Sequence, residues 1–175
     1  MSVLKIYTWP SAVLEQRAQE VSLFDANLRK LVEDLQATMH HHQGVGLAAN
    51  QVGVLQRVLV MHHKHYKEDG PRLAWHDKDL TFINPCITKK QGKTRTMEGC
   101  LSFPEIWEYV ERAEEIWVEA QDATGQTFTT HATGILSICL QHEMDHLDGL
   151  VFVKRLSRLK YNLVKKKLQK LQTME

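Results

Sequence analysis

Apolar residues recur at helical spacing in three stretches of the chain. In residues 25–42 the apolar positions are three or four apart, Asp25 precedes them as an N-cap, and Gly44 follows as a stop. Residues 134–149 show the same period. The tail at 156–171 has leucines at helical spacing, namely Leu156, Leu159, Leu163, Leu168 and Leu171. We therefore predict three helices, the last of them C-terminal.

Between the first two helices the pattern becomes that of strands. Residues 57–62 are rich in β-branched and long apolar side chains, and 80–84 and 86–90 predict two further strands on either side of Pro85. Residues 114–132 predict a hairpin with a turn at Thr124-Gly125 and one apolar face, formed by Ile116, Val118 and Ala120. Helices and strands are segregated rather than alternating, so we expect an α+β fold.

Composition limits the class of protein. With 175 residues, 43% of them hydrophobic and 25% charged, we expect one domain spanning residues 1–175. The net charge of +1 provides no global field toward nucleic acid or membrane. Neither a membrane span nor a signal peptide is evident, so we expect no membrane contact and a cytoplasmic location. The three cysteines are too few and too scattered for a disulfide scaffold, which fits a reducing compartment.

The sequence His142-Glu143-Met144-Asp145-His146 lies in the second predicted helix. Residues four apart share a helix face, so His142 and His146 can reach one metal ion. Glu143 lies on the adjacent face and can accept a proton from a water on that ion. The alternative is a pair of histidines that only cap or hydrogen-bond the helix, but a glutamate in that slot of an apolar helix favours the metal.

A metal held by two histidines needs a third ligand, and the usual downstream positions supply none. Phe152 stands where a histidine would complete a longer zinc motif, and no carboxylate follows Asp148 before the last residue. Cys100, within Glu98-Gly99-Cys100-Leu101-Ser102, is the best upstream candidate because a thiolate is a strong ligand. Cys139 shares the helix face of the histidines and could ligate by distance alone, but three ligands from one helix would leave the ion unclosed. We expect Cys139 to line a cavity.

Residues 44–51 read Gly-Val-Gly-Leu-Ala-Ala-Asn-Gln. Their glycines and alanines form a backbone-rich wall that another group can approach closely, and Gln51 adds an amide that can donate a hydrogen bond. A helix end followed by a tight connection is the plainer interpretation of this segment taken alone.

The three segments GVGLAANQ, EGCLS and QHEMDH, in this order, resemble the signatures of the peptide deformylase family. The opening residues and the helix after them also resemble that family, and the helical tail is similar to its bacterial and organellar group. The resemblance implies antiparallel sheets packed around a central metal-binding helix, with a C-terminal helix. It also implies hydrolysis of the N-formyl group from N-formylmethionyl nascent peptides, with release of formate.

The resemblance also assigns roles to residues. The implied metal ligands are Cys100, His142 and His146. They would hold one divalent ion, with Fe²⁺ expected and Zn²⁺, Co²⁺ or Ni²⁺ also suited, and a water in the fourth position as the nucleophile. Glu143 would take the proton of that water and pass it to the leaving amine. Gln51 and the backbone N–H of Leu101 would stabilise the oxyanion.

A substrate pocket is expected from the helix period. Ile135, Ile138 and Cys139 precede the first motif histidine on its own face. With Val45 and Gly46 opposite, they would form an apolar slot beside the metal that suits an unbranched methionine side chain. Core packing is the alternative role for these residues.

Five further residues are expected near the site. Glu98 would support a metal ligand from behind, and Asp145 would pair with Arg112. Trp107 and Tyr109 either line the mouth of the cleft or cover the core.

Six other histidines are expected to be solvated. His62, His63 and His65 open a polar stretch at 62–79 that is longer and more histidine-rich than we expect of the family. They could bind metal as a surface cluster, but solvated loop residues are the simpler interpretation. Residues 40–42 are three histidines that close a helix, where imidazolium favours the dipole.

The tail at 154–175 has eight Lys or Arg and one Glu, which predicts a basic amphipathic helix. It either docks on the domain with a solvated outer face, or binds ribosomal RNA phosphates near where nascent chains emerge. The family resemblance also implies ribosome docking.

We expect a monomeric metalloenzyme of the deformylase type, with two alternatives from other classes. A small peptidase could use the same metal and Glu143, and would cleave blocked peptides instead of releasing formate from formyl-Met-Ala-Ser. An RNA-binding module with a structural metal would need a fourth protein ligand, for which we find no convincing candidate. Intact Glu143, Gln51 and Cys100 speak against an inactive relative.

Overall fold

The computed structural model describes residues 1–62 and 79–172, with side chains described to residue 170. Its helices are α1 (Ala26–His41), α2 (Gly134–Leu147) and α3 (Arg158–Gln172). Its strands are β1 (Gly46–Ala48), β2 (Val58–Met61), β3 (Leu80–Gln91), β4 (Thr94–Cys100), β5 (Phe103–Arg112), β6 (Glu115–Gln121) and β7 (Thr127–Thr133). The α+β prediction is confirmed. In this part of the chain no helix has the length and apolar character needed to cross a bilayer.

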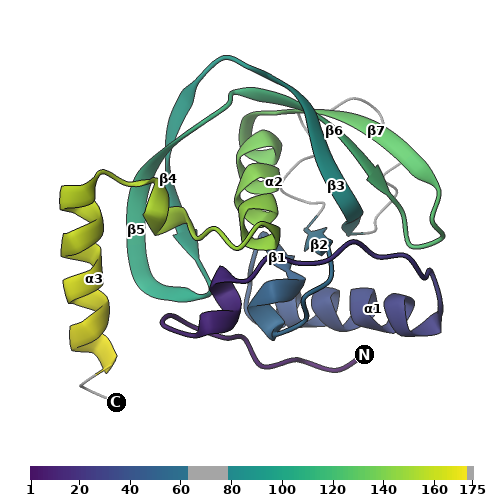
Figure 1. Ribbon diagram of the computed structural model, residues 1–175, viewed down its shortest axis with the longest axis horizontal. Helices are drawn as coiled ribbons and strands as arrows, with labels where there is room; N and C mark the ends of the chain where they lie inside the picture. The colour runs from purple at the N-terminus through teal and green to yellow at the C-terminus, as the bar shows by residue number, and fades with distance from the viewer. Residues whose placement is uncertain (63–78, 173–175) are drawn as a thin grey trace.

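The strands form two antiparallel sheets around α2. Five of them pair in the order β1-β2-β3-β6-β7, and β4 pairs with β5 alone. The helix α2 runs through the middle of the molecule, with strands on either side of it, while α1 lies below and α3 lies outside β5 (Figure 1). The predicted hairpin is confirmed as β6–β7, and its apolar residues at 116, 118 and 120 are buried.

One stripe of α2 packs into the core of the larger sheet. The stripe consists of Leu136, Leu140, Met144 and Leu147, which contact buried residues of β2, β3 and β6. Since this stripe uses one face of the helix, the neighbouring face is left to look toward β1 and β4. A second apolar cluster joins α1 to β1 and β2, and a third joins β5 to the short turn Phe152–Arg155 and α3.

The first helix begins as predicted and ends slightly differently. The Asp25 side chain accepts hydrogen bonds from the backbone N–H groups of Asn27 and Leu28, so it is the N-cap. At the other end the residue with a left-handed backbone is Gln43, with φ of 54°, rather than the expected Gly44. The backbone N–H of Gly44 then donates to the Met39 carbonyl and closes the helix.

Two strands were predicted around Pro85, and that prediction is wrong. The segment is one strand, β3, which carries on through the proline. Its register against β6 shifts between Ile83 and Cys86, and Asn84 has a positive φ of 51°. The missing N–H of Pro85 therefore falls in an irregular part of the ladder, where no hydrogen bond is lost.

The basic tail forms a helix, but it starts at Arg158 rather than at residue 154 and buries only part of the predicted apolar stripe. Val164 and Leu168 are 6% and 5% exposed, whereas Leu159 and Leu163 are 72% and 59% exposed. Residues 164 and 168 are four apart and face β5 and the Phe152–Arg155 turn, so the leucines at 159 and 163 point to the other side.

Candidate metal centre

The two histidines of α2 lie on its inward face, as their spacing predicts. The ring centroids of His142 and His146 are 5.1 Å apart. Both side chains are buried, at 8% and 1% exposure. The face is thus removed from bulk water while it presents two imidazoles to one point in space.

Cys100 is brought to the same point from the other sheet. It ends β4 at the corner before β5, where the register shifts between Gly99 and Cys100. The Cys100 Sγ lies 3.2 Å from His146 Nε2. Potential ligand atoms of Cys100, His142 and His146 all lie within 4.8 Å of one another. One thiolate and two imidazoles at this separation can hold a single tetrahedral divalent ion.

The first histidine is oriented from behind by a carboxylate. Glu98 Oε2 lies 2.8 Å from His142 Nδ1, so Nε2 is left to face the cysteine. Arg112 holds Glu98 through two hydrogen bonds of 2.7 and 2.8 Å. Arg112 also pairs with Asp145, and Asp145 pairs in turn with Arg155. The expected contacts of Glu98 with His142 and of Arg112 with Asp145 are present. The pairing of Arg155 with Asp145 was not predicted, because nothing in the sequence beyond the charge of Arg155 indicates it.

The surroundings of the two imidazoles act on them in opposite directions. Burial lowers the pKa of His142, but its hydrogen bonds to Cys100 and Glu98 and the charges of Cys100 and Glu143 outweigh burial, so the pKa lies well above its ordinary value. Burial and the neighbouring positive charges hold the pKa of His146 well below its ordinary value. In the absence of an ion, these opposite shifts favour a proton on His142 and a neutral His146. A divalent cation would replace that proton.

Glu143 lies beside the histidines and against β1. A Cβ added to Gly46 would lie 2.6 Å from Glu143 Oε1, so only glycine leaves room for this carboxylate. Glu143 Oε2 is buried and has no hydrogen-bond partner within residues 1–62 and 79–170. Burial raises the pKa of Glu143 to about 7. A carboxyl group that gains and loses a proton near neutral pH suits general acid–base work.

Gln51 is fixed next to the cysteine. Its Oε1 accepts from the backbone N–H of Ala48 at 2.9 Å, which turns its Nε2 toward Cys100 Sγ at 3.6 Å. The same Nε2 donates to Ser102 Oγ at 3.2 Å. Ser102 is fully buried and was given no role from the sequence, although a polar residue inside the cysteine segment was a signal that could have been used.

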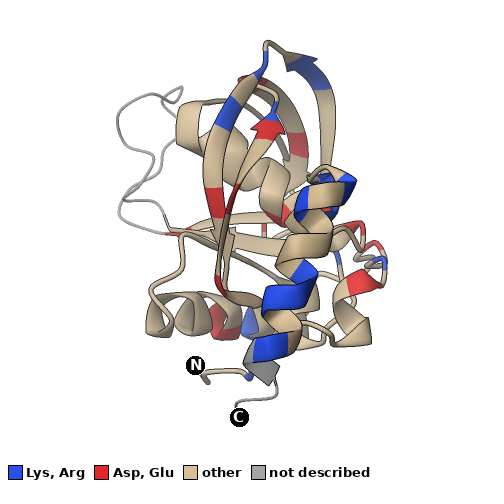
Figure 2. Ribbon diagram, turned by 90° about the vertical axis from the view of Figure 1, so that its left-hand side faces the viewer, with Lys and Arg blue, Asp and Glu red and all other residues tan. Residues whose placement is uncertain are grey.

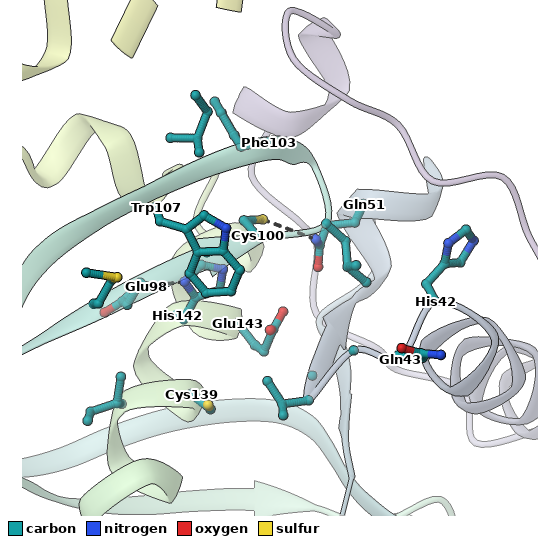
Figure 3. A pocket seen from close by; sticks show the side chains of 18 of the residues that line it. His42, Gln43, Gln51, Glu98, Cys100, Phe103, Trp107, Cys139, His142 and Glu143 are labelled. Carbon is teal, nitrogen blue, oxygen red and sulfur yellow. Dashed lines mark hydrogen bonds and ion pairs between the residues drawn. The ribbon is translucent and has the colours of Figure 1, made fainter. Parts of the chain in front are cut away.

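A cavity opens in front of these groups (Figure 3). Its volume is about 660 Å³, within the usual range for a small-ligand site. The predicted pocket residues all line it, namely Val45, Gly46, Ile135, Ile138 and Cys139, as does Leu101. Ile135 is 59% exposed, so core packing does not account for it.

Of the two aromatic residues expected near the cleft, one lines it. Trp107 is part of the cavity wall and packs over Gly99, where an added Cβ would meet its ring at 2.8 Å. Tyr109 is not among the lining residues, and its ring lies 5.5 Å from the guanidinium carbon of Arg95. Of these two aromatic side chains, Trp107 is therefore the one placed to contact a ligand in the cavity.

The remaining histidines differ in part from the expectation of solvated side chains. His40 and His62 both contact Asp79. His63 and His65 lie outside the described residues. His41 and His42 stack edge to face at the end of α1, and His42 also lines the cavity.

Comparison with known proteins gives consistent matches. The family model described as "Polypeptide deformylase" matches residues 3–162. The curated protein "Peptide deformylase" of Neisseria gonorrhoeae is 46% identical over 172 residues, 98% of each chain. The one of Chromobacterium violaceum is 43% identical over 170 residues, which cover 97% of this chain and 96% of the relative.

Solved structures agree in fold. The peptide deformylase of Ehrlichia chaffeensis in complex with actinonin has a TM-score of 0.87 and 42% identity, over 97% of this chain and 98% of that one. The peptide deformylase from Legionella pneumophila has a TM-score of 0.87 and 36% identity, over 99% of this chain and 97% of that one.

Proposed function

The chain belongs to the polypeptide deformylase family, which makes it a hydrolase that removes N-formyl groups from nascent peptides, and we propose how its own residues perform that reaction. The single observation that carries the proposal is the meeting of a thiol, two imidazoles and a buried carboxyl group at one end of an apolar cavity. The reaction adds water to the formyl carbon and breaks its bond to nitrogen, releasing formate and a free amine.

Cys100 Sγ, His142 Nε2 and His146 Nε2 hold the metal in this proposal. The donor set fits one divalent ion with an open position, and we expect Fe²⁺, with Zn²⁺, Co²⁺ or Ni²⁺ able to take its place. When bound, the ion supplies Lewis acidity that lowers the pKa of a water toward neutrality. The Glu98 carboxylate fixes the His142 ring, because it occupies Nδ1 at 2.8 Å and leaves only Nε2 for the ion.

Glu143 moves the proton. Burial raises its pKa, which suits it to accept the proton of the attacking water and return it to the leaving nitrogen. Gly46 lets the carboxyl group lie against β1, where Oε2 is buried and close to the reacting atoms. Burial of Glu143 thus has two effects on the proposed reaction, because it raises the pKa of the carboxyl group and excludes bulk water.

Two hydrogen-bond donors stabilise the developing oxyanion. The Gln51 amide is held near Cys100 because its Oε1 accepts from the Ala48 backbone N–H and its Nε2 donates to Ser102 Oγ, and the backbone N–H of Leu101 follows directly after the cysteine. Each donor of this kind is typically worth about 3–4 kcal/mol of transition-state stabilisation. The methionine side chain of the substrate lies in the apolar slot between β1 and α2, lined by Val45, Gly46, Ile135, Ile138 and Cys139.

The test of this mechanism is Glu143→Gln, with Glu119→Gln on an exposed strand position as its control. After anaerobic purification, both variants should contain one metal ion per chain by elemental analysis. Formate release from formyl-Met-Ala-Ser should fall by about 10²–10⁴ in kcat for Glu143→Gln only. Full activity in that variant would overturn the proton-transfer role. Cleavage of an acetylated peptide by the wild-type protein would instead favour a peptidase.

We also propose that α3 docks on the ribosome through phosphate contacts. Its outer face is basic (Figure 2), and its exposed cations include Arg158, Lys165 and Lys166. Lys160 and Lys167 are instead tied to β5 through the Glu108 carboxylate and the Glu105 carbonyl. The exposed cations are thus available to a polyanion while the helix stays on the domain.

This docking has a direct test. A chain ending at Ser157 should keep its activity on short formyl peptides and bind ribosomes less tightly. The double variant Lys165→Gln, Lys166→Gln keeps the helix and should also bind ribosomes less tightly. Ribosome affinity that is equal at low and high salt would contradict the electrostatic proposal.

We further propose that the chain acts as a monomer of one domain, residues 1–175, in the cytoplasm where formylated nascent chains emerge. Its apolar clusters support the single domain, because they join the N-terminal segment at Leu14 to α3 at Leu168. Light scattering after size-exclusion chromatography should give the mass of one chain.

A further inference from the structure

Outside the site described above, the structure gathers a second set of metal-ligating side chains. His40 lies in the last turn of α1, His62 directly follows β2, and Asp79 directly precedes β3. His40 Nε2 contacts Asp79 Oδ2, and His62 Nδ1 lies 3.3 Å from Asp79 Oδ1. Potential ligand atoms of all three residues lie within 4.8 Å of one another. Two imidazoles and one carboxylate thus meet at a single point.

The positions of these residues follow from strand register and helix period. Val60 is opposite Thr81 and Met61 is opposite Leu80, so the next step of the same register places His62 opposite Asp79. Gln36, one turn before His40 on α1, donates to Thr81 Oγ1 at 3.4 Å. The helix face that holds Gln36 near residue 81 therefore holds His40 near residue 79. The cluster is built by regular elements of the fold.

We propose that His40, His62 and Asp79 form a second metal site, for a borderline divalent cation such as Zn²⁺ or Co²⁺. Nitrogen and oxygen ligands at about 2.0–2.1 Å from a tetrahedral ion are about 3.3 Å apart, which is the separation of His62 Nδ1 and Asp79 Oδ1. The carboxylate brings one negative charge to two imidazoles that ligate when neutral, so the set favours a cation.

The cluster is accessible without being fully exposed. The side chains of His40, His62 and Asp79 are 44%, 19% and 11% exposed. An ion can therefore enter from solvent, while the two less exposed ligands are held by the surrounding structure. This burial distinguishes the cluster from scattered surface histidines.

Binding there would join three elements and reach the wall of the catalytic cavity. The ion would tie the end of α1 to the adjoining ends of β2 and β3. The backbone N–H of His62 donates to the Val45 carbonyl at 2.9 Å, and Val45 lines the cavity. An ion at this site thus stabilises the segment that carries the pocket wall, and we expect thermal stability to rise when it binds.

The test uses Co²⁺ with the metal-loaded protein. Wild-type protein should take up one Co²⁺ ion more than His40→Ala, His62→Ala or Asp79→Asn in equilibrium dialysis. His41→Ala, an exposed histidine on the same helix end, is the matched control and should bind as wild type does. Because the cluster has no sulfur, the additional Co²⁺ should add visible absorption without a thiolate charge-transfer band.

Thermal unfolding gives a second readout. Added Co²⁺ should raise the Tm of the loaded wild-type protein and of His41→Ala, and should leave the Tm of His40→Ala unchanged. Equal Co²⁺ uptake by wild type and all three ligand variants would overturn the proposal and leave His40–Asp79 as an ion pair alone. Neither measurement depends on catalytic turnover, so failure here is separate from failure of the proposed mechanism.

Discussion

At Gly46 an added Cβ would lie 2.6 Å from Glu143 Oε1 and 2.9 Å from its Cγ. Glu143 is buried and cannot move into solvent. A methyl group at position 46 would therefore displace the Glu143 carboxyl group within the site. A residue with no side chain therefore decides where the Glu143 carboxyl group lies.

We predict that Gly46→Ala keeps its metal and loses at least about tenfold in kcat, since displacements of about 1 Å near reacting groups are costly. Formate release from formyl-Met-Ala-Ser and metal analysis measure the two effects. Glu143→Asp shortens the side chain, so the double variant Gly46→Ala, Glu143→Asp should lose less than the two single losses combined. Losses that simply multiply would show that the two residues do not act on one another.

At the scale of elements, α3 shows how a helix can present two apolar stripes and bury only one. Val164 and Leu168 pack with buried residues of β5 and the Phe152–Arg155 turn. Leu159 and Leu163 lie on the same helix and remain exposed beside its basic residues. Helical period alone indicates that both sets are candidates for burial, and the partner surface selects between them.

Leu168→Ala should lower the free energy of unfolding by about 2 kcal/mol, the low end for buried leucines, because a terminal helix relaxes readily. Leu159→Ala is its matched control and should change stability by less than about 0.5 kcal/mol. Urea unfolding of the two variants beside wild type makes the comparison. Equal effects would mean that α3 docks by a different face.

At the scale of the whole molecule, a buried set of charges links the two-stranded sheet to α2. Glu98 on β4, Arg112 at the end of β5 and Asp145 on α2 are connected by ion pairs, and Arg155 extends the set to the turn before α3. Burial alone would raise the pKa of Glu98, but hydrogen bonds from Arg112 and His142 lower it to about 2. The carboxylate that contacts His142 is therefore also part of what holds the elements together.

This arrangement predicts acid sensitivity. Because the folded pKa of Glu98 is about 2, below its ordinary 4.5, the carboxylate stabilises the fold above pH 4.5. That contribution is lost as the pH falls from 4.5 toward 2. Urea unfolding of the metal-free protein across this range should show the decline, and Glu98→Gln should show a shallower one. Parallel curves for the two proteins would contradict the assignment.

The sequence by itself determined whatever depends on local geometry. The period of α2 placed two imidazoles on one face, since helix geometry fixes where residues four apart must lie. The Asp25 cap and the β6–β7 hairpin followed from equally local rules. The cysteine segment could be selected as a source of the third ligand because thiolates are rare and strong ligands.

Only the tertiary structure decided what depends on contacts between distant segments. It set Cys100 beside His146, turned Glu98 onto His142, and brought His40 to Asp79. It also determined which face of α3 is buried and that β3 continues through Pro85. No local rule fixes these outcomes, because each depends on which surfaces meet once the chain has folded. Residues far apart in the sequence can be brought into contact in this way.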